Sequence, residues 1–275
     1  MAFGAVFHRN RPQWLRPLER AVYRVFGWPN IIRRLQWPHV LSMLQLGPND
    51  TVVDLGAGSM QYTAELAKQA HGHVIAVDLL VPAGSAEWAR SHNVTALNAD
   101  ALKLPFADHS IDRVVVSSLL QAVPDPDRML SECHRVLKAN GALVLIVPNH
   151  YRYIPRAYAC FGRRLKRLLR LPDAFSQFVH ELNRCFHANG PQGYFSRGEL
   201  SALLSRNAFI IDRHRFSPGA LGTLLWEVGI LLYPRVGPAA VYLSFLFYPL
   251  AKAWDRMNVS VHGGEHVVKA VPVAC

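Results

Sequence analysis

A carboxylate and two glycines near the end of a short apolar run are the residues with the clearest chemical potential. Asp54 lies in the run 51–55, and Gly56 and Gly58 follow it, before a helical pattern over 62–70. A strand that passes through a glycine turn into a helix presents backbone N–H groups to a ligand at the C-terminal edge of a parallel sheet. The pattern predicts a nucleotide-like ligand at this edge.

A second apolar run, 74–77, ends in Asp78. A carboxylate only accepts hydrogen bonds, which suits the paired hydroxyls of a ribose. The sequence therefore predicts a ligand that carries a ribose. A dinucleotide fits less well, because its fingerprint needs a third glycine three positions after the second, where this chain has Gln61.

The order Asp54-x-Gly56-x-Gly58 resembles the first motif of the class I S-adenosylmethionine-dependent methyltransferases. In that family the glycines let the backbone approach the methionine part of the cofactor, and the acid lies near its ammonium group. The resemblance implies S-adenosylmethionine as the cofactor and methyl transfer as the activity. Met60 stands where the family usually has its third glycine, and we expect its side chain to narrow the pocket.

Later motifs follow in the family's order and extend the resemblance over about residues 48–150. Asp78 matches the acid that binds the ribose hydroxyls, 98–101 looks like the adenine-binding corner, and 104–112 is similar to the "LPF-D-SFD" entry to the fourth strand. The resemblance is to the ubiquinone/menaquinone-type and small-molecule branch. The cofactor-binding residues that it implies are Asp54, Gly56, Ala57, Gly58, Asp78, Leu79, Asp100, Ala101 and Ser117.

The resemblance implies an α/β fold, with a doubly wound, seven-stranded, mostly parallel Rossmann-like sheet whose last strand is antiparallel. Periodicity predicts a helix over 125–138 that ends at Asn140-Gly141, with Gly141 as its C-cap. We further expect a strand over 142–147, a helix over 197–206, and strands over 209–215 and 265–273. The expected segments are N-terminal helices over 1–47, the cofactor-binding half over 48–150, a basic helical insertion over 151–195, and the C-terminal half over 196–275.

The formal net charge is +11, and much of it lies in two blocks where arginines alternate with aromatic residues, 9–37 and 151–170. Such blocks suit an anionic membrane surface or nucleic acid. The four cysteines lie far apart without CxxC spacing, so we expect neither a metal site nor a disulfide framework, and a cytoplasmic location. Residues 1–10 lack the apolar core of a secretion signal, which also argues against export.

An apolar insertion over 217–256 favours the membrane over nucleic acid. Its two parts, 220–233 and 237–250, are separated by Pro234-Arg235 and contain Glu227 as their single charge. As helices, each would reach about 21 Å, short of the roughly 30 Å hydrocarbon core. We therefore expect a helical hairpin that dips into the inner leaflet. The alternative is a hydrophobic lid or a dimer interface.

The expected acceptor is a lipophilic small molecule, such as a quinone, an isoprenoid phenol or a lipid headgroup. Transfer from a sulfonium needs mainly alignment and a dry cavity, although a phenol or an acidic carbon would benefit from a base. The candidate catalytic residues are His150, Tyr151, Gln121, His187 and Tyr194. For each histidine, an ordinary polar loop residue is the alternative. For the whole chain, the alternatives are a soluble natural-product methyltransferase with an apolar lid and a catalytically silent membrane-associated member.

Overall fold

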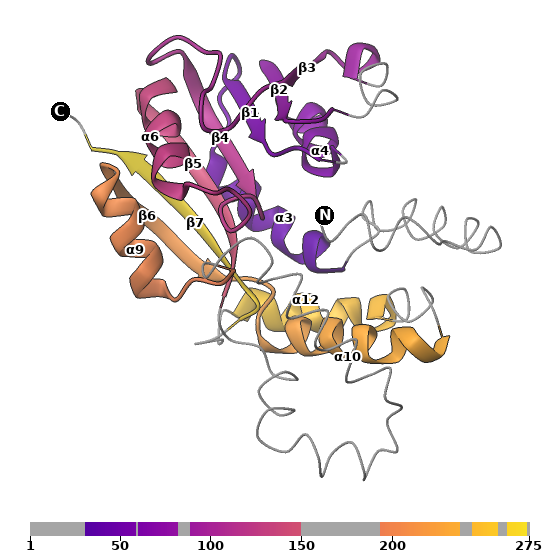
Figure 1. Cartoon of the computed structure of the whole chain (residues 1–275). Coiled ribbons are helices and arrows are strands. Elements are labelled where there is room, and N and C mark those ends of the chain that lie inside the picture. The colour runs from indigo at the N-terminus through magenta and orange to yellow at the C-terminus, as the bar shows by residue number, and fades with distance from the viewer. Residues whose placement is uncertain are drawn as a thin grey trace. The chain divides into compact units, whose positions relative to one another are not determined.

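Seven strands of the described residues form one sheet in the order β3-β2-β1-β4-β5-β7-β6 (Figure 1). The computed structural model describes residues 31–58, 60–81, 89–149, 193–236, 244–257 and 263–273. The strands β1 to β5 pair in parallel, and the last strand, β7, is antiparallel. The strands are β1 (Thr51–Leu55), β2 (His73–Asp78), β3 (Val94–Asn98), β4 (Ile111–Ser117), β5 (Leu137–Pro148), β6 (Phe209–Phe216) and β7 (Glu265–Pro272).

The strand order confirms the predicted fold class. Parallel strands buried on both faces are continuous apolar runs, and the central strands β4 and β5 follow this rule, with Val114 to Val116 and Leu143 to Val147 fully buried. The described helices are α3 (Ile31–Leu44), α4 (Gln61–Gln69), α6 (Pro126–Val136), α9 (Arg197–Arg206), α10 (Ala220–Val236) and α12 (Tyr248–Met257), with a short 3₁₀ helix η2 (Ser244–Phe247).

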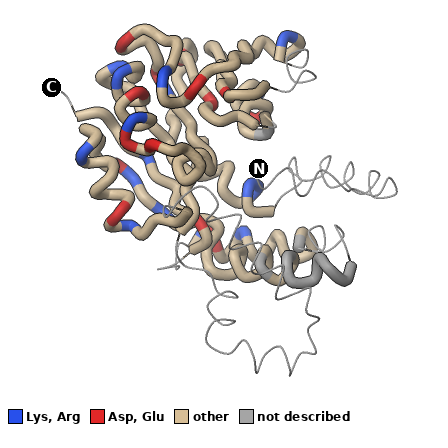
Figure 2. Tube along the Cα trace, in the orientation of Figure 1, with Lys and Arg blue, Asp and Glu red and all other residues tan. Residues whose placement is uncertain are grey.

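The chain divides into two compact units, each built from three segments. The sheet unit comprises 39–148, 194–215 and 266–275, and the insertion unit comprises 1–38, 149–193 and 216–265. Acidic and basic positions are interspersed along the sheet unit (Figure 2).

The insertion unit contains buried polar side chains that bind one another. Gln36 donates to Glu265 Oε2 over 2.6 Å and to the Ser217 carbonyl over 2.8 Å. Asp255 accepts from the Gly219 N–H over 2.9 Å. These contacts satisfy groups that would be costly to bury alone, and they join α3 and α12 to the start of α10.

The predicted end of helix α6 is wrong. The helix stops at Val136, and strand β5 begins at once with Leu137, which pairs with Ile111. Gly141 therefore lies inside β5, at an irregularity in the ladder, and it does not cap a helix. A Cβ there would lie 2.8 Å from the Lys138 carbonyl oxygen, so close backbone approach explains the glycine.

The predicted break at Pro234-Arg235 is also wrong, because α10 continues through it to Val236. A proline in a last helical turn removes one backbone N–H, and this helix accommodates that loss for two further residues. The second apolar part, 237–250, contains η2 and the first residues of α12, which runs on to Met257. Among the helices described, none has both the length and the apolar composition that crossing a membrane requires.

Candidate cofactor site

The glycine turn that the sequence predicted follows β1, and both of its glycines have positive φ. Gly56 and Gly58 have φ of 78° and 50°, in the left-handed region that a side chain disfavours by about 1–2 kcal/mol. The N–H groups of Gly56 and Ala57 both donate to the Val77 carbonyl, over 2.8 and 3.1 Å, which anchors the turn to the end of β2. A Cβ on Gly56 would lie 2.9 Å from the Leu119 side chain, whereas a Cβ on Gly58 would make only an ordinary contact, 3.9 Å from the Gly56 carbonyl oxygen.

Asp78 lies against this turn. Its Oδ2 accepts from the Gly58 N–H over 2.8 Å, and its Oδ1 accepts from the Leu80 N–H over 3.2 Å. Each carboxylate oxygen has two lone pairs, so acceptor capacity remains for a ligand hydroxyl. The structure therefore brings the second-strand acid and the glycine turn together, as a ribose beside the turn requires.

Asp54 is buried and accepts from the Thr63 hydroxyl of α4 over 2.5 Å. This bond joins the end of β1 to the helix that follows the glycine turn. Its expected place near the cofactor's ammonium group stays a prediction.

Met60 has φ of 57°, a left-handed conformation that a glycine adopts without strain. The residue immediately precedes α4, and its side chain is buried. This backbone conformation explains why a glycine suits the position.

Replacement of Met60 by glycine is expected to leave the fold intact. Relief of about 1–2 kcal/mol of backbone strain offsets much of the lost side-chain burial, about 1.5–3 kcal/mol. We expect the affinity for S-adenosylmethionine to change several-fold, as isothermal titration calorimetry would measure. An unchanged dissociation constant would mean that the Met60 side chain does not border the cofactor.

The predicted adenine corner lies on the loop next to Asp78. The Ala99 N–H donates to the Asp78 carbonyl over 3.0 Å, and the Asp100 Oδ1 accepts from the Leu102 N–H over 2.9 Å. Ala101, beside them, is buried. Because β2 and β3 pair in parallel up to Asp78 and Asn98, the two loops leave the same edge of the sheet.

Two large apolar side chains beside Asp78 are open to solvent. Leu79 is 68% exposed and Leu80 is 82% exposed. Such exposed apolar surface beside hydrogen-bonding groups is typical of a ligand site. It suits a flat ring with polar edges, such as adenine.

The loop after β4 carries buried polar atoms without partners. Ser117 Oγ and Gln121 Oε1 have no hydrogen-bond partner among the described residues, and Ser118, between them, has φ of 54°. A buried polar atom without a partner costs about 1–3 kcal/mol, and strained residues gather at functional sites. Val116 pairs with Leu55, so this loop leaves the sheet beside the glycine turn. The residues present therefore fit a polar ligand at this edge.

Of the five predicted catalytic residues, the structure describes two, Gln121 and Tyr194. Gln121 belongs to the loop just described, beside the glycine turn. Tyr194 precedes Phe195, whose N–H donates to the Pro148 carbonyl over 3.1 Å at the C-terminal end of β5. His150, Tyr151 and His187 lie outside the described residues, as do most of the predicted N-terminal helices and of the predicted basic insertion.

Sequence reasoning missed a histidine pair between β6 and β7. His266 Nε2 lies 2.8 Å from the Phe195 carbonyl oxygen, and His266 Nδ1 lies 2.8 Å from His214 Nε2. Because a carbonyl only accepts, His266 donates from Nε2 and accepts at Nδ1 from His214. Burial above all, together with the nearby His266 and Arg197, lowers the pKa of His214 to about 4.

This pair predicts a loss of stability in acid. The folded-state pKa of His214 lies below its unfolded value of about 6.5. Its contribution is therefore fully present above pH 6.5 and is lost as the pH falls towards about 4. The amide of a glutamine can still donate to His266. We therefore expect the melting temperature of His214→Gln to depend less on pH between these two values than that of the unmodified protein. Equal pH profiles for the variant and the unmodified protein would contradict this assignment.

Comparisons with known proteins agree with this geometry. Residues 53–145 match the methyltransferase domain family. The chain is 31% identical over 113 residues to a demethylmenaquinone methyltransferase of Staphylococcus epidermidis, covering 39% of this chain and 47% of the relative. It is 40% identical over 102 residues to one of Mycobacterium sp. (strain KMS), covering 37% and 43%. The chain thus spans about half the length of the curated relatives it matches.

Two solved structures show the same fold at low sequence identity. Geranyl diphosphate C-methyltransferase from Streptomyces coelicolor, in complex with S-adenosylhomocysteine, has a TM-score of 0.56 and 18% identity, covering 86% of this chain and 77% of its own. The [4+2]-cyclase SpnF has a TM-score of 0.54 and 19% identity, covering 88% and 82%. Together, the strand order, the ordered motifs and the matched family show a methyltransferase domain over residues 53–145, set in the fold of the class I S-adenosylmethionine-dependent methyltransferases.

Proposed function

We propose that this protein transfers the methyl group of S-adenosylmethionine to a lipophilic small molecule at the surface of a membrane. The observation that carries the proposal is the contact between the Gly58 N–H and the Asp78 carboxylate, which brings the glycine turn and the second-strand acid together. It supports a cofactor whose ribose binds Asp78 while its amino-acid part follows the glycine turn. The exposed Leu79 and the Asp100 corner support an adenine on the other side of Asp78.

The cofactor, when bound, supplies an electrophilic methyl group on a sulfonium. The protein's share of the chemistry is alignment and exclusion of water. Gln121 is our first candidate for contact with the acceptor, because its Oε1 is buried without a described partner beside the glycine turn. Tyr194, His150, Tyr151 and His187 remain candidates for a base, should the acceptor lose a proton.

An isoprenoid acceptor is the class that the comparisons favour. The two curated relatives are named for demethylmenaquinone, and the Streptomyces coelicolor enzyme for geranyl diphosphate, and both names denote isoprenoid compounds. Lipid extracts incubated with the protein and S-adenosylmethionine would test this class by mass spectrometry. We expect one isoprenoid species to gain the mass of a CH₂ group, and a gain confined to water-soluble molecules would favour the soluble natural-product methyltransferase with an apolar lid.

A silent or altered activity is the second candidate. The [4+2]-cyclase has this fold, so the fold alone does not establish methyl transfer. Binding of S-adenosylmethionine without turnover on any extract would favour this candidate.

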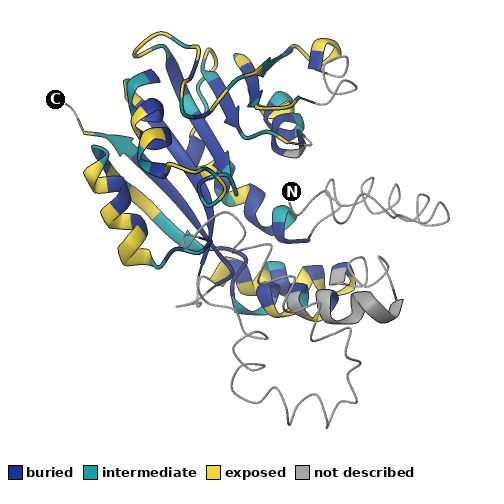
Figure 3. Cartoon of the chain, viewed as in Figure 1, coloured by how far each residue is buried: buried dark blue, intermediate teal, exposed yellow. Residues whose placement is uncertain are grey.

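The exposed apolar residues of η2 and α12 support the membrane part of the proposal. The apolar residues that they expose are Leu246, Phe247, Leu250, Trp254 and Met257, and from Phe247 onward they recur at a spacing of three or four, as on one helix face. The opposite face is buried through Tyr248, Ala251 and Asp255. Figure 3 shows such exposed positions along α12. We call the five exposed residues the apolar stripe.

The charges of α12 fit an anionic lipid surface. Asp255 is buried and holds the Gly219 N–H, whereas Arg256 is exposed and Lys252 is half-buried, 5.7 Å from the Tyr248 ring centroid. Each basic residue near an anionic membrane contributes about 1 kcal/mol. An apolar stripe beside basic residues is the pattern of a helix that lies in the membrane interface. The proposed location is therefore the inner face of the cytoplasmic membrane.

Substitution of Leu250 and Trp254 by serine is expected to weaken vesicle binding at least about tenfold, because each buries apolar area in lipid. Co-sedimentation with anionic and neutral vesicles measures the effect. The unmodified protein should prefer anionic vesicles, and salt should remove only part of its binding.

Ile210→Ser is the matched control, because Ile210 on β6 is 57% exposed and Leu250 is 58% exposed. An intact protein that stays in the supernatant with anionic vesicles at low salt would remove the membrane from the proposal. The lid alternative would then take its place.

A further inference from the structure

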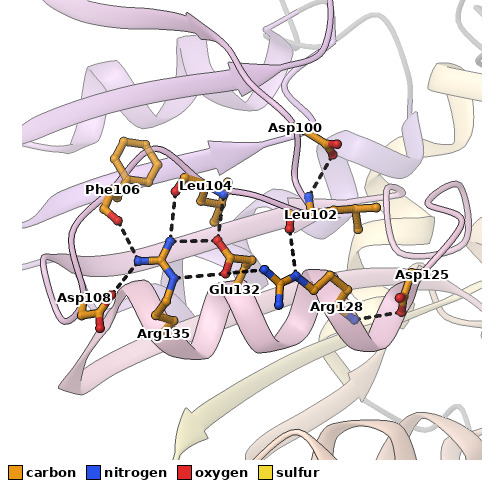
Figure 4. A network of polar contacts seen from close by, with 9 residues as sticks. All are labelled: Asp100, Leu102, Leu104, Phe106, Asp108, Asp125, Arg128, Glu132 and Arg135. Atoms are coloured by element: carbon orange, nitrogen blue, oxygen red, sulfur yellow. Dashed lines mark hydrogen bonds and ion pairs between the residues drawn. The ribbon is translucent and has the colours of Figure 1, made fainter.

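The loop between β3 and β4 is held by side chains of α6. The backbone carbonyls of three alternate residues each accept from an arginine of that helix (Figure 4). Arg128 Nε donates to the Leu102 carbonyl over 3.1 Å. Arg135 donates to the carbonyls of Leu104 and Phe106 over 2.9 and 2.8 Å. The loop is thereby held through its backbone carbonyls.

Glu132 links the two arginines. It is buried, and its Oε2 accepts from the Leu104 N–H and from Arg135, both over 2.8 Å. Arg128 Nη2 lies 3.6 Å from its Oε1. Hydrogen bonds from Arg135 and from Leu104 lower the pKa of Glu132, so the carboxylate stays charged near neutral pH. The network therefore sets both the position of the loop and the side-chain geometry of Arg128.

Leu102 connects this network to the cofactor site. Its carbonyl accepts from Arg128, and its N–H donates to Asp100 Oδ1 over 2.9 Å. A shift of Leu102 would therefore turn the carboxylate that the adenine corner presents. We infer that Arg128 is a positioning residue for cofactor recognition, which acts by holding Leu102 and, through it, Asp100. The inference rests on the proposed function, since it takes Asp100 to contact the adenosyl part of S-adenosylmethionine.

Arg128 offers a cleaner test than Arg135. Its side chain is 55% exposed, so its removal leaves no large cavity. Arg206, on α9, is a matched control because its side chain is equally exposed. It forms two hydrogen bonds, of 2.6 and 2.7 Å, with Asp127 of α6, the helix that carries Arg128. Among the described residues, these hydrogen bonds of Arg206 reach Asp127 and not the loop 98–110. Loss of charge and of an ion pair at α6 is thus common to both variants.

Calorimetric titration with S-adenosylhomocysteine tests the inference on the full chain. We expect Arg128→Gln to raise the dissociation constant about three- to tenfold, the range for one lost hydrogen bond, and Arg206→Gln to leave it unchanged. Arg128→Lys should restore part of the affinity. In a double-mutant cycle with Asp100→Asn, Arg128→Gln should add little, because both act through one carboxylate.

Two outcomes would overturn the inference while the proposed function stands. One is equal affinity of Arg128→Gln and Arg206→Gln, and the other is full additivity with Asp100→Asn. Absence of binding by the unmodified protein would instead remove the proposed function, and the inference with it. Thermal denaturation of each variant shows whether a change in affinity reflects loss of the folded protein.

Discussion

Replacement of Asp78 by alanine is expected to weaken the binding of S-adenosylmethionine by about 1–3 kcal/mol, because ribose hydroxyls lose a charged acceptor. The structure adds a second reason. The Gly58 N–H and the Leu80 N–H both donate to this carboxylate, so its removal also loosens the backbone on either side of the site. Isothermal titration calorimetry with the cofactor or its demethylated product measures the change.

A control variant must distinguish the loss of the Asp78 contacts from the general effect of removing one negative charge. Asp212→Ala removes a carboxylate that pairs with Lys269 on the far strands of the sheet, over 2.9 Å. It should leave the dissociation constant unchanged. If the two aspartate variants bind the cofactor equally well, Asp78 has no place in the site.

Replacement of Arg135 by leucine is expected to lower the free energy of unfolding by about 3–5 kcal/mol. The guanidinium holds Glu132, Asp108 and two backbone carbonyls, and its loss leaves Glu132 buried without its main partner. In this variant, solvent can hydrate the exposed Asp108 carboxylate, whereas the Glu132 carboxylate stays buried. Chemical denaturation measures the loss.

The paired variant identifies the cause. Glu132→Leu together with Arg135→Leu should be more stable than Arg135→Leu alone, because no buried charge is left unpaired. A double variant as unstable as the single one would show that the loop carbonyls, and not the carboxylate, carry the effect.

The elements that the sequence predicted well are those with local signals. Helix α9 spans Arg197–Arg206 as expected, because Ser196 and Glu199 form a capping box that marks its start. The glycine turn and Asp78 follow from residues next to one another in the chain. Their approach across strands follows from parallel pairing of β1 with β2, which the family resemblance already implied.

The features that the sequence did not predict depend on packing between distant segments. The early start of β5 is set by pairing with Ile111, and no residue near Asn140-Gly141 signals it. The contacts of Arg135 reach carbonyls about thirty positions earlier, and backbone carbonyls have no sequence signature. His214 and His266 meet across fifty-two positions because the antiparallel β7 lies beside β6.

Binding of S-adenosylhomocysteine to the unmodified chain is the measurement that tests the central claim most directly. We predict saturable one-site binding by calorimetry, together with thermal stabilisation equivalent to about 2.7 kcal/mol when the ligand is present at one hundred times its dissociation constant. Binding heat should fall sharply in Asp78→Ala and persist in Asp212→Ala. A folded protein that shows neither binding heat nor stabilisation would contradict the account of the glycine turn and Asp78 as a cofactor site.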